Sequence, residues 1–327
     1  ACAWADLDLD GDLDLFAARG WFRSQRDALY WNQGNGTFTP ANAEQVGPLL
    51  TTRLSSGSVV CFDHDGDGAQ DLLVNHVQMG SYLHRNNRDG TFSRLPQSVF
   101  SPFPPDLMSS VADYDNDGRM DVYLGAAMVR RSMLYRHLED GTFADVTEAA
   151  GIRPPPREQY AVGNWADYDN DGFLDLFIAS YATNSLYRSR GDGTFESVGV
   201  GNMHTDGYRR ILGTWGDYDN NGFPDLYVVC GDGERSRNFL YRNNGNGNHW
   251  LKIRLVGTAS NRDGLGARIR ATATIAGRAM TQLRELSGHA SWASVGDRLA
   301  HFGLGDAGVA TRVRIEWPSG TVQELSN

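Results

Sequence analysis

The sequence predicts an all-β fold of the β-propeller type, with five four-stranded repeats visible and a total of six to eight blades left open. Three observations support this prediction. An acidic motif occurs five times, and its first aspartates are 57, 50, 54 and 50 residues apart. A glycine-containing turn motif follows each acidic motif. The segments between these motifs are short, rich in β-branched and aromatic residues, and without helical periodicity, so helix has little support anywhere in the chain.

Each repeat is predicted to consist of a strand, the acidic loop, a second strand, a longer loop, a third strand, a tight turn and a fourth strand. The second strands are "LDLFAA", "DLLVNH", "DVYLGA", "DLFIAS" and "DLYVVC". Asn-Gly or Asp-Gly between apolar segments is a strong hairpin signal, because both central turn residues need positive φ. The turns are "NQGNGTF" ending at Phe38, "NNRDGTF" at Phe92, "HLEDGTF" at Phe143, "SRGDGTF" at Phe195 and "NNGNGNHW" at Trp250.

The acidic loops have the composition of a calcium site. Counted from the first aspartate, oxygen-bearing side chains stand at positions 1, 3, 5 and 9, with glycine at position 6. Carboxylates this close repel one another unless a cation neutralises them, and Ca²⁺ accepts six to eight oxygen ligands in a flexible cage. About five structural Ca²⁺ ions are therefore expected. The predicted ligands are Asp6, Asp8, Asp10 and Asp14; Asp63, Asp65, Asp67 and Asp71; Asp113, Asp115, Asp117 and Asp121; Asp167, Asp169, Asp171 and Asp175; and Asp217, Asp219, Asn221 and Asp225.

Three other interpretations of these loops are weaker. Solvated acidic turns would not repeat one spacing five times with a single change, to Asn221. Catalysis does not need five equivalent copies, and Mg²⁺ demands a stricter octahedral geometry. The loop is similar to the first half of an EF-hand loop, but position 12 holds an apolar residue in every copy, so the position-9 aspartate is expected to close the site.

These motifs resemble the integrin-α-like FG-GAP or VCBS repeat over residues 1–247. The resemblance implies that each DxDxDGxxD loop binds Ca²⁺ between the first two strands of a propeller blade, in a structural role. It also changes the meaning of the formal charge of −10. Of the 40 acidic residues, 19 are predicted metal ligands, so the remaining 21 acidic residues face 30 basic residues. The acidity therefore indicates metal binding and not a polyanionic surface.

Residues 248–327 are predicted to form a second all-β module. Alternating segments such as "LKIRL", "ARIRATATI" and "RVRIEW" indicate half-buried strands. With "NRDGLGAR", "FGLG" and "WPSG", this part resembles the ASPIC/UnbV module of the cartilage acidic protein and UnbV-like family. We expect it to pack on the propeller or complete it, and its first segment, "NGNHWLKI", to complete the fifth blade. His249 and His301 are interpreted as structural histidines.

If the acidic loops lie at one face of the propeller, the other long loops lie at the opposite face, where function usually resides. Arginine and aromatic residues are frequent in these loops, and they favour carboxylate, sulfate, phosphate or sugar ligands. Alternatively, these arginines only make the loops soluble and bind no ligand. The candidate ligand-binding residues are Arg19, Trp21, Arg23, His76, Arg130, Arg131, Tyr181, His204, Arg209, Arg210 and Arg235.

We therefore expect a calcium-stabilised, secreted, cell-surface or periplasmic binding or adhesion propeller that recognises an anionic glycan, a small anionic ligand or a protein partner. The start at "ACAW" suggests a processed N-terminus. No apolar run reaches the roughly 18 residues of a membrane span, and no nucleic-acid-binding motif is present. The alternative is an enzyme that uses the opposite-face channel. It would be a polysaccharide lyase or hydrolase, or a cyclase-like enzyme of bacterial secondary metabolism, cytoplasmic in the latter case. A purely structural interaction protein is a third possibility.

Overall fold

The computed structural model describes residues 1–20, 25–76, 80–96, 100, 107–126, 132–153, 161–180, 184–199, 210–231, 237–288 and 298–326. The repeats form five antiparallel sheets, four of four strands and a fifth of three, which confirms the predicted propeller-type all-β fold. The strands are, sheet by sheet, β1 (Cys2–Ala5), β2 (Asp14–Ala17), β4 (Ala28–Asn32) and β5 (Phe38–Pro40); β7 (Ser56–Phe62), β8 (Asp71–His76), β9 (Gly80–Asn86) and β10 (Phe92–Arg94); β11 (Leu107–Ala112), β12 (Asp121–Ala126), β13 (Met133–His137) and β14 (Phe143–Asp145); β15 (Val162–Ala166), β16 (Asp175–Ala179), β17 (Ser185–Ser189) and β18 (Phe195–Val198); and β19 (Arg210–Gly216), β20 (Asp225–Cys230) and β21 (Phe239–Tyr241).

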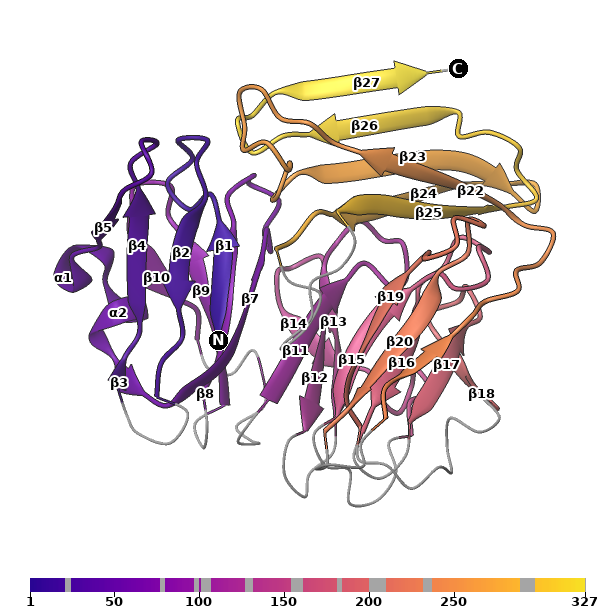
Figure 1. Ribbon diagram of the computed structural model, residues 1–327, viewed down its shortest axis with the longest axis horizontal. Helices are drawn as coiled ribbons and strands as arrows, with labels where there is room; N and C mark the ends of the chain where they lie inside the picture. Colours follow the sequence, from indigo (N-terminus) through magenta and orange to yellow (C-terminus); the bar gives the residue numbers. More distant parts are fainter. Residues whose placement is uncertain are drawn as a thin grey trace.

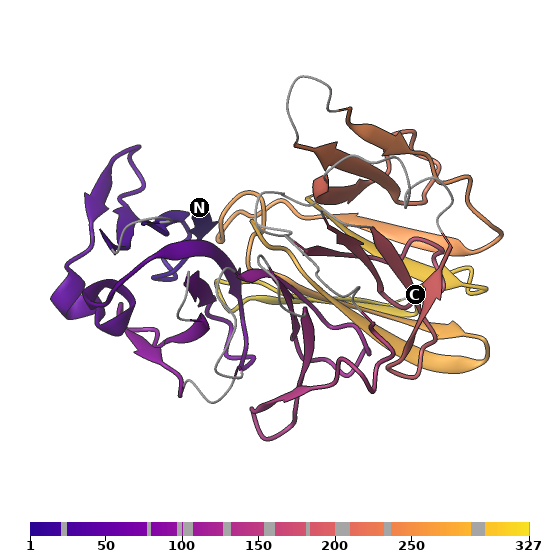
Figure 2. The same cartoon turned by 90° about the horizontal axis from the view of Figure 1, so that it is seen from below.

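The five sheets follow one another along an arc, with the first and the fifth at its two ends (Figures 1 and 2). The first strands of successive sheets pack side by side, β1 on β7, β7 on β11, β11 on β15 and β15 on β19. Glycine also permits β15 to approach β12, because a Cβ on Gly163 would lie 2.3 Å from the ring of Tyr123. Apolar side chains of neighbouring sheets fill the space between them, as Phe62 and Leu73 of the second sheet do with Val122 of the third.

Two short helices depart from the expectation that helix has little support. They are α1 (Ala43–Val46) and α2 (Pro48–Thr51), between the first and second sheets, where β3 (Gln25–Arg26) also pairs with β6 (Arg53–Leu54). The Asn42 side chain accepts hydrogen bonds from the N–H groups of Glu44 and Gln45 and so caps α1. Pro48 begins α2. Among the described residues, no helix is both long and apolar enough to cross a membrane.

The C-terminal module lies across one end of the blades (Figure 1). It contains β22 (His249–Arg254) paired with β25 (Leu299–Gly305), and a four-stranded sheet in the order β24 (Arg278–Glu285), β23 (Arg268–Ile275), β26 (Arg312–Glu316) and β27 (Val322–Ser326). The two sheets share one apolar core around Phe302 and Ile269.

The expectation that "NGNHWLKI" completes the fifth blade is wrong, because β22 pairs with β25 and not with β21. The fifth turn lacks the Thr-Phe that ends the other four. Instead, the side chains of Asn246 and Asn248 donate to the backbone carbonyl of Asp169, at 2.7 and 2.9 Å. These bonds tie the turn to the fourth repeat, and the chain continues from there into the module.

Candidate metal centres and the cavity beneath the C-terminal module

The acidic segments are named loop 1 (residues 6–14), loop 2 (63–71), loop 3 (113–121), loop 4 (167–175) and loop 5 (217–225). The position-9 aspartate begins the second strand of each repeat and ties it to its neighbours. In loop 2, the Asp71 carboxylate accepts from the N–H groups of His64 at 2.9 Å and Asn86 at 2.7 Å. The other four position-9 aspartates make the equivalent pair of bonds. This carboxylate therefore organises the strands, and its remaining lone pairs are still available to a cation.

The carboxylates at positions 1, 3 and 5 converge in loops 1 and 2, and those at positions 1, 3 and 9 converge in loops 3 and 4. In loop 2, Asp63 accepts from the N–H groups of Asp67 and Gly68, at 3.1 and 3.0 Å, which wraps the backbone around it. Three carboxylate oxygens lie within 4.8 Å of one another in each of loops 1 to 4. In loop 1, Oδ1 of Asp6 is buried and has no hydrogen-bond partner, and Oδ1 of Asp169 in loop 4 is in the same situation. An all-oxygen donor set with buried free oxygens fits Ca²⁺.

Electrostatics also favour a cation in these loops. Burial, reinforced by the neighbouring carboxylates of Asp117 and Asp115, raises the pKa of Asp113 to about 7. Burial and Asp171 raise the pKa of Asp167 to about 8. Without a metal, part of this negative charge is therefore suppressed by protonation near neutral pH. A divalent cation would hold the carboxylates ionised.

An arginine at the end of the third strand, or directly after it, contacts the position-3 carboxylate in four of the repeats. Its Nε lies 2.6 to 2.7 Å from an oxygen of that carboxylate. These contacts were not predicted, although the signal was present as an arginine four residues before the Asp-Gly or Asn-Gly pair of the last four turns. The first repeat has Trp31 at this position. The arginine–aspartate pairs are Arg85–Asp65, Arg136–Asp115, Arg188–Asp169 and Arg242–Asp219.

The C-terminal module reaches the position-1 aspartates with its own cations. Arg268 Nη1 lies 2.9 Å from Oδ2 of Asp63, and Lys252 forms an ion pair with Asp217. Arg284 is close enough to Asp167 and Asp113 for both carboxylates to raise its pKa, although burial lowers it more. The module therefore covers loops 2 to 5 with positive charge at the first residue of each loop.

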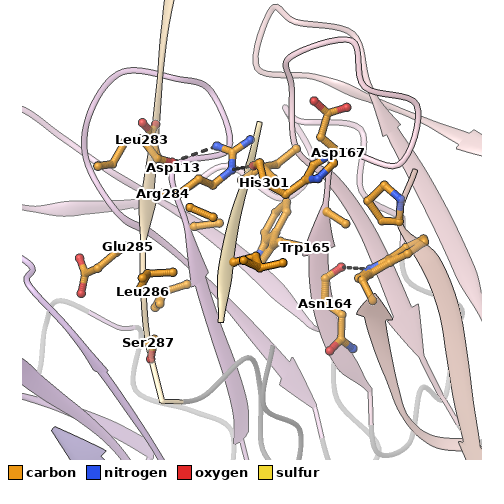
Figure 3. Close-up of a pocket in the computed structure, with 18 of the residues that line it drawn as sticks. Asp113, Asn164, Trp165, Asp167, Leu283, Arg284, Glu285, Leu286, Ser287 and His301 are labelled. Atoms are coloured by element: carbon orange, nitrogen blue, oxygen red, sulfur yellow. Dashed lines mark hydrogen bonds between the residues drawn. The ribbon is translucent and has the colours of Figure 1, made fainter. Parts of the chain in front are cut away.

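A cavity of about 230 Å³ lies between the module and the first strands of the second to fifth sheets. Trp165 and Trp215 form part of its wall on the propeller side, and Arg284, Leu286 and His301 do so on the module side. Figure 3 shows Arg284, His301 and Trp165 on one side of β24, with Glu285 pointing to the other side. The sequence indicated a structural role for His301, and no local pattern indicated that it lines the same cavity as Trp165.

The opposite-face candidates are only partly placed. Arg210 is described only in its backbone, at the start of β19. Eight other candidates lie outside the described residues: Trp21, Arg23, Arg130, Arg131, Tyr181, His204, Arg209 and Arg235.

The two candidates that are placed, Arg19 and His76, belong to one network. The Arg19 N–H donates to Asp27 at 2.8 Å, the Ser56 hydroxyl donates to the same carboxylate at 2.8 Å, and that hydroxyl lies 3.0 Å from Nδ1 of His76. His76 is buried, and burial lowers its pKa to about 4. The Arg19 side chain is exposed and donates to the Tyr30 hydroxyl at 2.7 Å. Of the pair, only Arg19 is therefore accessible to a partner.

An arc of antiparallel sheets, each with an acidic loop after its first strand, defines a propeller of acidic-loop repeats. The chain belongs to the FG-GAP-like repeat family, whose model matches residues 6–74, 63–124 and 167–228. Residues 257–327 match the ASPIC and UnbV family.

Two curated relatives are similar to this chain over most of its length. Cartilage acidic protein 1 of Homo sapiens is 25% identical over 301 residues, which cover 88% of this chain and 42% of the human protein. Cartilage acidic protein 1 of Mus musculus is 25% identical over 307 residues, which cover 90% of this chain and 44% of the mouse protein. The chain thus spans less than half the length of these relatives.

A solved structure shares the fold. It is an Agrocybe aegerita lectin described as specifically recognising non-reducing terminal N-acetylglucosamine. The likeness has a TM-score of 0.50 at 18% identity and covers 88% of this chain and 80% of the lectin chain.

Proposed function

We propose that this chain is a calcium-stabilised binding propeller that works outside the cytosol and recognises an anionic glycan or a protein partner at the end opposite the acidic loops. One observation carries the proposal: the module covers the acidic-loop end. The side chains of Asp63, Asp113 and Asp167 are buried beneath it. Carboxylates in that position serve the scaffold, and the loops at the other end remain for a partner.

The residues that would hold calcium are the side chains at positions 1, 3, 5 and 9 of each loop. The bound ion would neutralise the carboxylates and brace the connection between the first two strands of a blade. Extracellular calcium is abundant enough to fill loops of modest affinity, whereas cytosolic calcium is not. This difference is the reason for proposing a secreted, cell-surface or periplasmic location.

Two further features support recognition of an anionic glycan. The opposite-end loops contain arginine beside aromatic residues, which suits carboxylate or sulfate groups on a sugar. The fungal lectin is a precedent for sugar recognition by a protein of this fold, although its identity to this chain is only 18%.

The test is retention on immobilised heparin, a sulfated glycan, with terminal N-acetylglucosamine beads and a protein array in parallel, in calcium buffer. Arg209→Ala with Arg210→Ala should reduce retention on heparin, while Arg312→Ala, an exposed module arginine paired with Glu324, should not. Added salt should weaken binding, because exposed charges are screened. The proposed site would be contradicted if the chain bound neither heparin, nor the N-acetylglucosamine beads, nor the protein array. It would also be contradicted if both variants and the wild type were retained equally on heparin.

A further inference from the structure

The cavity beneath the module has no role in the proposed function, because it lies at the acidic-loop end. Its wall is largely apolar and aromatic, with Trp165, Trp215, Phe62, Met120 and Leu283 contributing from both sides. Trp165, which stacks on Tyr114 at a centroid distance of 6.0 Å, is only half-buried. Large apolar side chains that keep exposed surface inside a cavity provide binding energy for a ring-shaped molecule.

Two nitrogen atoms beside this cavity lack partners. Nε1 of Trp165 and Nδ1 of His301 are both buried, and neither makes a hydrogen bond. Trp215 occupies the equivalent position in the next repeat, and its Nε1–H does donate, to the Asn164 carbonyl at 3.4 Å. A buried polar group without a partner costs about 1–3 kcal/mol, so these two nitrogens are exceptions that need an explanation.

The proton on His301 can be assigned from its neighbours. Nε2 lies 2.6 Å from Oδ1 of Asn170, and Nδ2 of Asn170 donates to the Gly222 carbonyl at 3.0 Å, which fixes the orientation of the amide. Nε2 must then donate to Oδ1, and Nδ1 carries the free lone pair. The two unpartnered nitrogens are therefore one donor, on Trp165, and one acceptor, on His301.

Most charged atoms of the wall are engaged with the protein, although Oε2 of Glu285 is buried and has no hydrogen-bond partner. Arg284 donates to the carbonyls of His301 and Leu283, at 3.1 and 2.9 Å, and Lys252 pairs with Asp217. Oε1 of Glu285 accepts from the Asp63 N–H at 3.0 Å, and the side chain points away from Trp165 (Figure 3). An anionic ligand would also meet Asp113 and Asp167, so the cavity favours an uncharged one.

We propose that this cavity binds a small, uncharged, planar molecule of one or two rings that carries one hydrogen-bond donor and one acceptor. Its donor serves Nδ1 of His301, its acceptor takes the N–H of Trp165 at the edge of that ring, and its own rings lie against the apolar and aromatic wall. Because the cavity is at the other end of the blades, the site does not depend on the proposed glycan or protein partner.

The test compares three bicyclic molecules of nearly equal shape, titrated by calorimetry into the intact, calcium-loaded chain. Naphthalene has no hydrogen-bonding group, indole has a donor only, and 7-azaindole has a donor and an acceptor. We expect 7-azaindole to bind more tightly than indole, by about threefold to tenfold, since one hydrogen bond separates them. A crystal soaked with 7-azaindole should show it in the cavity.

Trp165→Phe keeps an aromatic ring but removes the indole N–H together with part of the ring surface, so both molecules should bind more weakly and the preference for 7-azaindole over indole should disappear. Trp4→Phe is the matched control, because Trp4 is 40% exposed, packs on Phe38 and does not line the cavity. It should preserve the preference for 7-azaindole. The proposal is overturned if no bicycle binds, if the cavity holds only ordered water in the soaked crystal, or if Trp165→Phe and Trp4→Phe behave alike.

Discussion

Nη1 of Arg268, in the C-terminal module, lies 2.9 Å from Oδ2 of Asp63, the first residue of loop 2, and the two residues are 205 positions apart in the sequence. Both side chains are buried, with exposed fractions of 9% and 0%. Nη2 of the same arginine donates to the Gly118 carbonyl of loop 3 at 3.4 Å. One cation therefore joins the module to two repeats.

Replacing Arg268 with alanine should strongly destabilise the calcium-free chain, because Asp63 would be left as a buried, unpaired charge. The free energy of unfolding should fall by about 3–5 kcal/mol in urea titrations. Arg312→Ala removes an exposed pair with Glu324 and should cost at most about 1 kcal/mol. Equal losses for the two variants would show that the Arg268 pair is not a buried contact in solution.

The residue at position 4 of each loop has a left-handed backbone conformation, and the leucine that stands there in loop 1 is poorly suited to it. Asn116 and Asn170 have a φ of 57° there, and Leu9 has 65°. This conformation costs a leucine about 1–2 kcal/mol, whereas asparagine tolerates it. Leu9→Asn should therefore raise the free energy of unfolding, by about 1 kcal/mol.

The reverse change gives the matching test. Asn116 also donates to the Gly172 carbonyl in the next loop, at 2.9 Å. Asn116→Leu should lower stability by more than Leu9→Asn raises it, since a hydrogen bond is lost as well. A neutral Asn116→Leu variant would contradict the loop geometry.

The calcium-free chain should lose stability as the pH rises from about 6.5 to 8. Burial and neighbouring carboxylates raise the pKa of Asp113 to about 7 and that of Asp167 to about 8, from 3.8. Between 3.8 and those values the folded chain holds protons that the unfolded chain has released, so raising the pH favours unfolding.

Histidine acts in the opposite sense, but only at lower pH. Burial lowers the pKa of His301 to about 3, so its contribution to stability is lost as the pH falls below the ordinary value of 6.5. Above pH 6.5 the unfolded histidines lose their remaining protons over about one pH unit, so the buried carboxylates, Glu285 with a pKa of about 7 among them, are expected to dominate. Melting temperatures measured in chelator between about pH 6.5 and 8 check this prediction. Added calcium should make the Tm depend less steeply on pH. A Tm that rises with pH in chelator would rule out the proposed protonation.

Loop 1 should depend most on its cation. It has Trp31 where the other repeats have an arginine, and its Asp6 keeps a buried oxygen without a partner. Asp10→Ala should remove about one calcium ion per chain and lower the Tm, without changing binding at the opposite end. Asp10→Asn is the control, because loop 5 already has Asn221 at this position, and most of the affinity should remain. Equal metal contents for Asp10→Ala and the wild type, measured by equilibrium dialysis, would show that Asp10 is not a ligand.

Local patterns predicted the repeats well. Each position-9 aspartate begins a second strand, as the spacing of Asp14 and Asp71 indicated, because strand and turn signals act over a few residues. The face on which the module packs could not be predicted, since the Arg268–Asp63 contact joins distant segments. His301 and Trp165 are brought together by the same docking, which local periodicity does not encode.

The charge balance was predicted less well. From the sequence, all 30 basic residues were counted against the 21 acidic residues that are not predicted ligands. In the structure, cations such as Arg136, Arg188 and Lys252 pair with loop aspartates. The positive surplus available to a partner is therefore smaller than composition indicates, and the partner site must be found by binding experiments.

The most direct test of the central claim, that the acidic loops hold calcium and brace the blades, is the calcium content of the purified chain together with its Tm before and after chelation. Five loops predict about five Ca²⁺ ions per chain and a Tm that falls by many degrees in chelator and recovers when calcium is restored. A chain that binds one ion or none, with a Tm indifferent to chelator, would contradict the account.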